Sequence, residues 1–305
     1  MPTIKERLRK SCPDCTASSI DTYTQSIRAL AREGGLDEVP QTAKWLTGTL
    51  LQKIKDKPLN QYKRFAIAGV KALGAYGKSD KKWHDAMNDS TKKYGTKRDK
   101  QKRTKREAEN WPDHGYAALR KLANDMHEEV EHLERDAPAS LSAAELYAYQ
   151  KYFVIRFYSM HALRGDLGDV RIQQKGQNYI YKKGPTGWHV HIGQHKTVRS
   201  HGAIDIRLAK SVQEALDKFL PMVRANTSHG YLLSTKRGLN KMSRKDMLIM
   251  LRNTTQRRLG KRLGVQLIRV LKTTESLESI DKAAELQREL GHGSVMQRRY
   301  VSKAE

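Results

Sequence analysis

Apolar residues in the first third of the chain recur at the spacing of an α-helix. From Ser18 onward they fall on one helical face, with serines available as caps and the Gly34–Gly35 pair as a stop. Two further segments, residues 42–56 and 59–77, repeat the pattern. The spacing predicts a compact module of three or four short amphipathic helices over roughly residues 17–90. Its apolar positions are Ile20, Tyr23, Ile27, Leu30, Leu46, Leu50, Ile54, Tyr62, Phe65, Ile67, Val70 and Leu73.

The next segment, TKKYGTKRDKQKRTKREAEN, is basic and has almost no large apolar side chain. It holds nine Lys or Arg against three acids. Such a composition buries too little apolar surface to fold alone, so we expect a basic linker over residues 96–110. It could be a solvated tether, a phosphate contact or a nuclear import signal, and composition does not separate these. The candidate DNA-binding residues are Lys97, Arg98, Lys100, Lys102, Arg103, Lys105 and Arg106.

Helical spacing returns after the basic segment and is interrupted once by short β-rich runs. A strongly apolar helix is expected over residues 140–163, with a capped start between Ser140 and Glu145. Four runs rich in β-branched and aromatic residues follow, separated by turns that contain Gly or Lys, and they predict a small antiparallel sheet. The expected fold class is therefore mainly α with a small antiparallel sheet. The runs are DVRIQ, NYIYK, GWHVHIG and AIDIRL.

The chain length favours two domains, because single cores usually stop growing near 250 residues. The chain has 305 residues. We expect a mobile N-terminal tail over residues 1–16, a helical domain over 17–95, the linker, and a second domain over 111–305.

Charge points to a polyanionic partner. Lys and Arg number 58 against 33 Asp and Glu, a net charge of +25. Binding to phosphates releases condensed counterions, so such an excess favours nucleic acid. No apolar run approaches the roughly 20 residues that cross a bilayer, and no apolar stretch follows the N-terminal charges as in a secretory signal. We therefore expect a cytoplasmic or nuclear protein that is not secreted and has no membrane partner.

Two residue groups could bind metal or carry redox chemistry. Cys12 and Cys15 are the only cysteines, and a structural zinc site would need two further ligands. Reduced thiols in the tail are the favoured interpretation, with a redox pair or a shared metal site as alternatives. His189, His191 and His195 lie in WHVHIGQH, where positions i and i+2 share a strand face, but no acidic or cysteine partner is near in sequence. We therefore predict no metal and no cofactor.

The end of the chain holds a second kind of signal. AELQRELGHGSVMQRRYV places His292 in a glycine turn eight residues before Tyr300. This stretch resembles the end of the catalytic domain in the tyrosine recombinase and phage-integrase family. QLIRVLKTT resembles the box of that family's second catalytic arginine, at Arg269, and HALRGDLGDVRI resembles its first, at Arg164. HKTVRSHGAIDIRL resembles the hairpin of the catalytic lysine, at Lys196.

The resemblance implies a metal-independent enzyme that cleaves and rejoins double-stranded DNA. Residues 17–95 would form the core-binding domain and 111–305 the catalytic domain. Tyr300 would be the nucleophile, forming a 3′-phosphotyrosyl intermediate. Proteins of this family integrate or recombine mobile genetic elements, including viral ones, and act as homotetramers on paired DNA sites. The remaining candidate catalytic residues are Arg164, Arg269, Lys196 and His292.

Three departures from the family pattern change the expected details. Gln266 stands where a histidine is usual, so it would support the site as a hydrogen-bond donor without transferring a proton. Leu167 replaces a common carboxylate, so we expect Asp166 or Asp169 to brace Arg164. Five residues follow Tyr300, which leaves little length for the C-terminal helix that many family members exchange.

Two other functions fit the same features. A type IB topoisomerase-like enzyme uses similar phosphotyrosine chemistry on a single duplex. A noncatalytic basic DNA-binding protein would bind with steep salt dependence and form no covalent adduct. The target DNA sequence and the direction of the reaction are not determined by these patterns.

Overall fold

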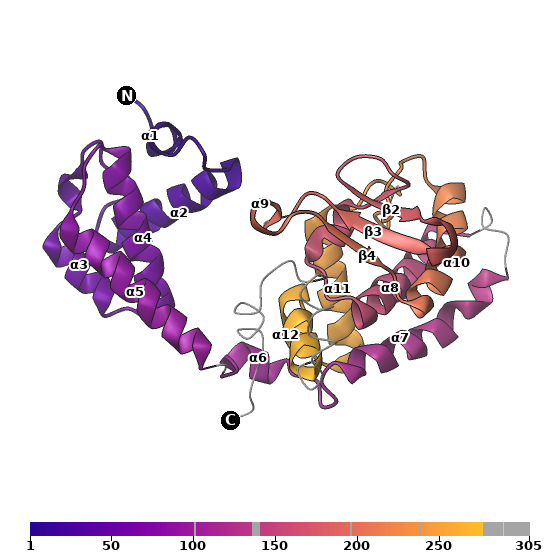
Figure 1. The fold of residues 1–305 in the computed structure, drawn as a ribbon. Coiled ribbons are helices and arrows are strands. Elements are labelled where there is room, and N and C mark those ends of the chain that lie inside the picture. Colours follow the sequence, from indigo (N-terminus) through magenta and orange to yellow (C-terminus); the bar gives the residue numbers. More distant parts are fainter. Residues whose placement is uncertain (101, 136–140, 196, 238, 277–288, 290–305) are drawn as a thin grey trace. The chain divides into compact units, whose positions relative to one another are not determined.

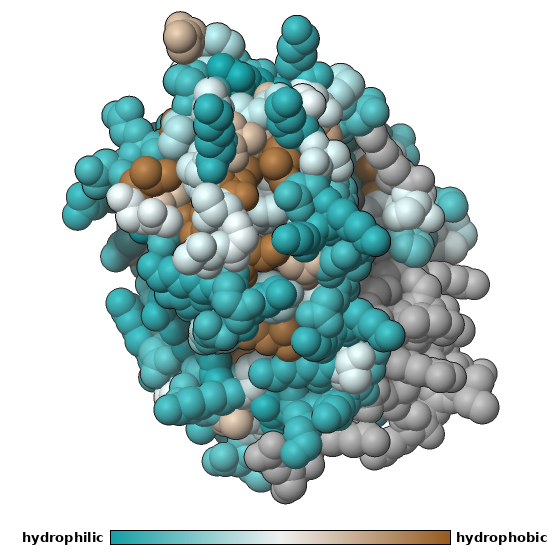
Figure 2. Space-filling model, turned by 90° about the vertical axis from the view of Figure 1, so that its left-hand side faces the viewer, coloured by the Kyte–Doolittle hydropathy of each residue, from teal (hydrophilic) through white to brown (hydrophobic). Residues whose placement is uncertain are grey.

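The computed structural model describes residues 1–305 except 101, 136–140, 196, 238, 277–288 and 290–305. The chain divides into two compact units, Met1–Lys100 and Gln101–Glu305 (Figure 1). The face in Figure 2 is mostly hydrophilic, and apolar residues show only in patches between polar ones. None of the described helices is long and apolar enough to cross a membrane.

The first unit is helical, as the apolar spacing predicts. Helix α4 packs against α1, α2, α3 and α5. Fully buried side chains such as Ile27, Phe65 and Trp83 form its core. The helices are α1 (Ile4–Ser11), α2 (Ala17–Glu33), α3 (Gly48–Lys55), α4 (Leu59–Ala75) and α5 (Lys81–Asp99), with a short 3-10 turn η1 (Ala43–Trp45).

Residues 4–11 form helix α1 where the sequence analysis expects a tail. Thr3 and Glu6 make a capping box: the Glu6 N–H donates to Thr3 Oγ1 and the Thr3 N–H donates to Glu6 Oε2. Leu8 is fully buried against the core, which anchors the helix. Behind it, Cys12 and Cys15 form a disulfide, in contrast to the expected reduced thiols. Helix α1 has only eight residues, which is too few for the helical spacing of its apolar residues to be recognised in the sequence.

Helices reach into the basic segment from both of its ends. Helix α5 continues to Asp99, and α6 (Lys105–Glu109) begins at a capping box made by Thr104 and Glu107. The guanidinium of Arg103 lies 3.7 Å from the centroid of a Trp111 ring. Lys, Arg and Glu are good helix formers, so a helix can continue through a stretch that adds nothing to a core. The division between the units falls after Lys100.

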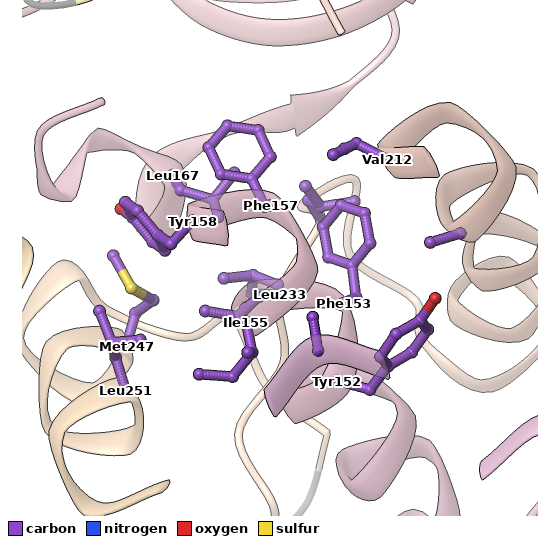
Figure 3. Packing of buried hydrophobic residues seen from close by; sticks show 14 of the residues in the cluster. Tyr152, Phe153, Ile155, Phe157, Tyr158, Leu167, Val212, Leu233, Met247 and Leu251 are labelled. Carbon is purple, nitrogen blue, oxygen red and sulfur yellow. The ribbon is translucent and has the colours of Figure 1, made fainter. Parts of the chain in front are cut away.

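Helix α8 (Ala143–Met160) is the centre of the second unit. Ser142 and Glu145 cap its start, as the sequence predicts. It contacts α7 (Ala117–Val130), α10 (Lys210–Asn226) and α11 (Arg244–Leu259), so it is apolar on several sides. Figure 3 shows Phe153 and Phe157 in the packed interior beside Val212 of α10. The 3-10 turn η2 (Glu131–Glu134) follows α7, and α12 (Val265–Ser276) is the last helix that the structure describes.

The sheet has the order β1-β2-β3-β4 and is mixed. The pairs β2–β3 and β3–β4 are antiparallel as expected, but β1 pairs with β2 in parallel. The chain turns back between them at Gln173 and Gly176, which have positive φ values of 74° and 83°. The strands are β1 (Arg171–Ile172), β2 (Asn178–Lys182), β3 (Trp188–Ile192) and β4 (Ile204–Arg207), with η4 (Gly165–Asp169), η5 (Gly184–Thr186) and α9 (Val198–His201) around them.

Gly69→Ala is expected to lower the free energy of unfolding by about 1–3 kcal/mol. A Cβ at this position would lie 2.1 Å from the buried Trp83 ring, which also donates from Nε1 to the Leu46 carbonyl and so resists movement. Gly74→Ala, on the same helix with nothing within 4 Å of its Cβ, is the matched control and should gain up to about 1 kcal/mol. Urea unfolding measures both. Equal effects would show that Trp83 does not limit the space at Gly69.

Candidate functional site

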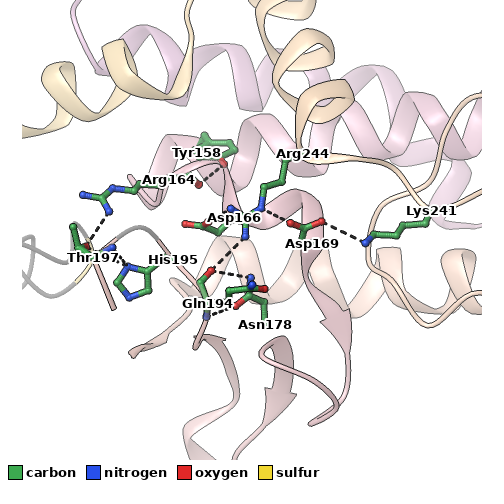
Figure 4. A network of polar contacts seen from close by, with 10 residues as sticks. All are labelled: Tyr158, Arg164, Asp166, Asp169, Asn178, Gln194, His195, Thr197, Lys241 and Arg244. Atoms are coloured by element: carbon green, nitrogen blue, oxygen red, sulfur yellow. Dashed lines mark hydrogen bonds and ion pairs between the residues drawn. The ribbon is translucent and has the colours of Figure 1, made fainter. Parts of the chain in front are cut away.

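Arg164 lies directly after the buried end of α8. Helix α8 ends at Met160, and His161, Ala162 and Leu163 are buried, so the backbone at Arg164 is held by the core. The Tyr158 hydroxyl donates to the Arg164 carbonyl at 3.0 Å. The guanidinium Nη1 donates to Thr197 Oγ1 at 2.9 Å (Figure 4). Thr197 follows Lys196 in the β3–β4 connection, so Arg164 and this connection are in direct contact.

The carboxylates expected to brace Arg164 pair with another arginine instead. Arg244, at the start of α11, contacts Asp166 Oδ1 at 2.9 Å and makes a second ion pair with Asp169 through Nε. Lys241 lies 3.4 Å from Asp169 (Figure 4). Burial raises the pKa of Asp166, and the positive charges of Arg244 and Arg164 oppose that rise. Asp166 therefore interacts with Arg164 through its charge, while its ion-pair partner is Arg244.

Arg244 was not among the site residues predicted from the sequence, although the backbone of η4 packs closely against it. A Cβ at Gly168 would lie 2.8 Å from the Arg244 Cα, so only glycine lets η4 pack against this end of α11. Arg244 also reaches the β3–β4 connection, where Nη2 donates to the Gln194 carbonyl at 3.3 Å. These contacts join η4, α11 and the connection.

His195 helps hold the β3–β4 connection in place. It is buried, and its Nε2–H donates to the Gly202 carbonyl at 2.9 Å. This leaves Nδ1 as an acceptor, and Thr197 Oγ1 lies 3.3 Å from it. Lys196, which stands between these two residues in sequence, lies outside the described residues.

The histidines on β3 do have an acidic neighbour, from the next strand. His191 Nδ1 lies 3.1 Å and His189 Nδ1 3.4 Å from the carboxylate of Asp205 on β4. Strand pairing rather than sequence proximity brings Asp205 there. Among the residues that the structure describes, no group of three or more ligands is arranged to hold a metal ion.

Arg269 and Gln266 lie one turn apart on α12. Arg269 is 2% exposed, whereas Gln266 is exposed. The charge of Arg269 reaches the region of Arg164: burial raises the pKa of Tyr158, and both Arg244 and Arg269 act in the opposite direction. Tyr158 is the residue whose hydroxyl donates to the Arg164 carbonyl, so the charge of Arg269 acts on a group that is bonded to the Arg164 backbone.

A buried ionic cluster lies next to these residues. Glu289 is 4% exposed, and its Oε1 lies 2.8 Å from His161 Nδ1. Its Oε2 accepts from the Ala162 N–H at 3.2 Å and from Lys272 Nζ at 2.6 Å. Burial alone would raise the pKa of Glu289, but the hydrogen bond from His161 and the charge of Lys272 outweigh it and lower the pKa to about 2. Glu289 was not a predicted site residue.

This cluster predicts a pH dependence of stability. The pKa of Glu289 falls from its ordinary 4.5 to about 2 on folding, so the ionised carboxylate stabilises the fold above pH 4.5. That stabilisation, about 3 kcal/mol, should be lost as the pH falls from 4.5 through 2. The free energy of unfolding of Glu289→Gln, measured with urea, should lack this contribution. The difference in this free energy between wild type and the variant should therefore shrink as the pH falls from 4.5 to 2.

Glu275→Gln is the control for this measurement. Glu275 pairs with Arg120 at 2.6 Å on the surface, where ion pairs contribute about 0–1 kcal/mol. A pH-independent difference between Glu289→Gln and wild type would contradict the assignment of an ionised, paired Glu289.

The candidate DNA-binding residues belong to two units. Lys97, Arg98 and Lys100 lie at the end of the first unit and are exposed. In the second unit Lys102, Lys105 and Arg106 are exposed and Arg103 is half-buried against Trp111. Their role in binding stays a prediction. His292 and Tyr300 lie outside the described residues.

Comparison with known proteins finds similarity at the level of structure. No family model matches the chain, and no curated protein matches it. A crystal structure of XerA recombinase aligns over 99% of this chain and 94% of its own, with 12% identity and a TM-score of 0.44. These values do not place the chain in a family.

Proposed function

We propose that this protein is a tyrosine-type DNA strand transferase, a site-specific recombinase or integrase. The observation that carries the proposal is a convergence of four segments that are far apart in sequence. Arg164 contacts Thr197, the neighbour of Lys196. Glu289, three residues before His292, contacts both His161 and Lys272, which lie three residues from Arg164 and Arg269 respectively. These contacts join the segments of Arg164 and Arg269 to Thr197 and Glu289, which are the described residues next to Lys196 and nearest to His292 in sequence, and this supports the proposal.

The chemistry needs a nucleophile, cations for the phosphate and an acid for the leaving group. The Tyr300 oxygen would attack the phosphorus, forming a 3′-phosphotyrosyl bond as the bond to the 5′ oxygen breaks and the phenolic proton passes to water. Arg164 and Arg269 suit the nonbridging oxygens because a guanidinium stays charged and donates in a fixed fork. Lys196 would protonate the departing 5′ oxygen. His292 and Gln266 would add hydrogen bonds to the phosphate.

Rejoining reverses these steps. A 5′ hydroxyl attacks the phosphotyrosyl bond, the tyrosine leaves, and the DNA backbone is restored. When the attacking hydroxyl comes from a second duplex, cleavage becomes strand exchange. We propose that this occurs on two double-stranded DNA sites held by a homotetramer, and the net charge of +25 supports the DNA partner.

A nicked duplex that traps the covalent intermediate tests the proposal. The protein is incubated in the presence of EDTA with duplexes that carry the end sequences of the mobile element on which it would act. Each duplex contains a nick, so that cleavage releases the short fragment with the 5′ hydroxyl. A protein–DNA band that survives denaturation, with the DNA attached to a tyrosine peptide, is the expected result. Binding without any such band would overturn the enzymatic proposal and favour a noncatalytic DNA-binding protein.

A second assay separates recombination from relaxation. Supercoiled plasmids with two sites or with none are compared at equal protein concentration. Exchange products on the two-site plasmid are expected. Relaxation that is independent of the sites, with no exchange, would instead favour a type IB topoisomerase-like enzyme.

A further inference from the structure

The cluster of Glu289, His161 and Lys272 connects three separate parts of the second unit. His161 directly follows α8, Lys272 lies on α12, and Glu289 belongs to the C-terminal segment. His161 and Lys272 are separated from Glu289 by 128 and 17 residues. Lys272 Nζ also donates to the Met160 carbonyl at 2.6 Å, so it connects α12 directly to the end of α8.

The spacing of this cluster relative to the proposed catalytic residues is regular. His161 precedes Arg164 by three residues, Lys272 follows Arg269 by three, and Glu289 precedes His292 by three. On α12 a separation of three places Lys272 and Arg269 on neighbouring turns of one helix. A displacement at any member of the cluster would therefore be transmitted over a short length of backbone to one candidate catalytic side chain.

The hydrogen bonds give the cluster a defined orientation. The Ala209 N–H donates to His161 Nε2 at 3.0 Å, so Nε2 is an acceptor and the proton is on Nδ1, which donates to Glu289. Glu289 then accepts from His161 through Oε1 and from the Ala162 backbone and Lys272 through Oε2, so both carboxylate oxygens are hydrogen-bonded. With His161 neutral and Glu289 and Lys272 ionised, the net charge of the cluster is zero.

We propose that Glu289, His161 and Lys272 are positioning residues that set the segments of Arg164, Arg269 and His292 in register. The inference rests on the proposed function. A buried ion pair often contributes no more stability than apolar residues of the same volume, whereas its directional bonds select one arrangement. Cleavage by two arginines and a histidine around one phosphate depends on such an arrangement, since a displacement of about 1 Å can cost about 10²-fold in rate.

The test compares Glu289→Gln, Lys272→Met and the double variant with wild type. Glu289→Gln keeps the side-chain volume but leaves the Lys272 ammonium against a neutral amide. The single-turnover rate of covalent complex formation on the nicked duplex should fall about 10²-fold at saturating protein. The dissociation constant for DNA should change less than about threefold, because the cluster is buried. In the double variant neither the Glu289 carboxylate nor the Lys272 ammonium is left without its partner. Its cleavage rate should therefore be higher than that of the slower single variant.

The control is Glu275→Gln, which breaks a surface tie between α12 and Arg120 of α7. Its cleavage rate should stay within about twofold of wild type. If Glu289→Gln also stays within twofold, or if the double variant shows the product of the two single losses with no recovery, the positioning role is overturned.

Hydrogen–deuterium exchange gives a readout that does not depend on activity. In Glu289→Gln, amides of the peptide that contains His292 should exchange at least about tenfold faster than in wild type, and in Glu275→Gln they should not. If wild type forms no covalent complex, the proposed function fails by itself, and the exchange result still decides whether the cluster holds this peptide. Unchanged exchange in Glu289→Gln would overturn the proposal in either case.

Discussion

Tyr300→Phe is expected to abolish the covalent protein–DNA complex. The substitution removes one hydroxyl and leaves the ring, so it removes the nucleophile with little change in volume. Loss of a nucleophile costs about 10⁶-fold in comparable covalent catalysis, which would put the band below detection on a gel. DNA affinity should stay within about threefold, because the net charge that drives phosphate binding is unchanged. A denaturing gel and a filter-binding assay measure the two quantities on the same nicked duplex.

Tyr181→Phe is the matched control. Its hydroxyl donates to Asp205 on the sheet, at 3.0 Å from Oδ2. We expect the covalent complex to form at the wild-type rate within about twofold. A band that persists in Tyr300→Phe would show that another residue is the nucleophile, and a band lost in both variants would point to a general effect of removing hydroxyl groups.

Arg269→Ala is expected to slow covalent complex formation by about 10²–10³-fold. Removing one preorganised donor from an anion-stabilising site has an effect of this size, because the charge on the phosphate grows in the transition state. Arg269→Lys should recover part of the rate, since a lysine keeps the charge but lacks the planar fork that binds two oxygens. Single-turnover rates at saturating protein measure both variants.

Arg269 is 2% exposed, so folding must be followed in parallel. Thermal unfolding of each variant, with rates taken well below the midpoint, separates lost catalysis from lost structure. Arg258→Ala is the control, because Arg258 pairs with Glu129 on the surface of the same unit and should contribute about 0–1 kcal/mol. A cleavage rate in Arg269→Ala within tenfold of wild type would contradict a role at the phosphate.

Much of the local structure could be predicted from neighbouring residues. The apolar spacing predicts α2, α3 and α4, and the Ser142–Glu145 capping box marks the start of α8. The alternation in the β-rich runs predicts the antiparallel pairs β2–β3 and β3–β4. Each of these features depends on residues a few positions apart, where the periods of helix and strand are directly visible.

The contacts of the candidate site residues were predicted only in part, and their catalytic roles stay predictions. Arg164 precedes η4 and Arg269 is buried on α12. Asp166 and Asp169 were expected to serve Arg164, yet Arg244 pairs with both. Nothing near Arg244 in sequence indicates this, because 75 residues separate it from Asp169.

The sequence by itself determined the sequence-local elements: the amphipathic helices, the capped start of α8, the antiparallel hairpins and the excess of positive charge. Only the tertiary structure decided which distant groups meet, including Leu8 with the first core, β1 in parallel with β2, and Glu289 with His161 and Lys272. Local periodicity encodes which face of an element is buried. It does not encode the partner of a buried charge, because many Lys, Arg and His residues carry the same chemistry and the packing of the whole unit selects among them.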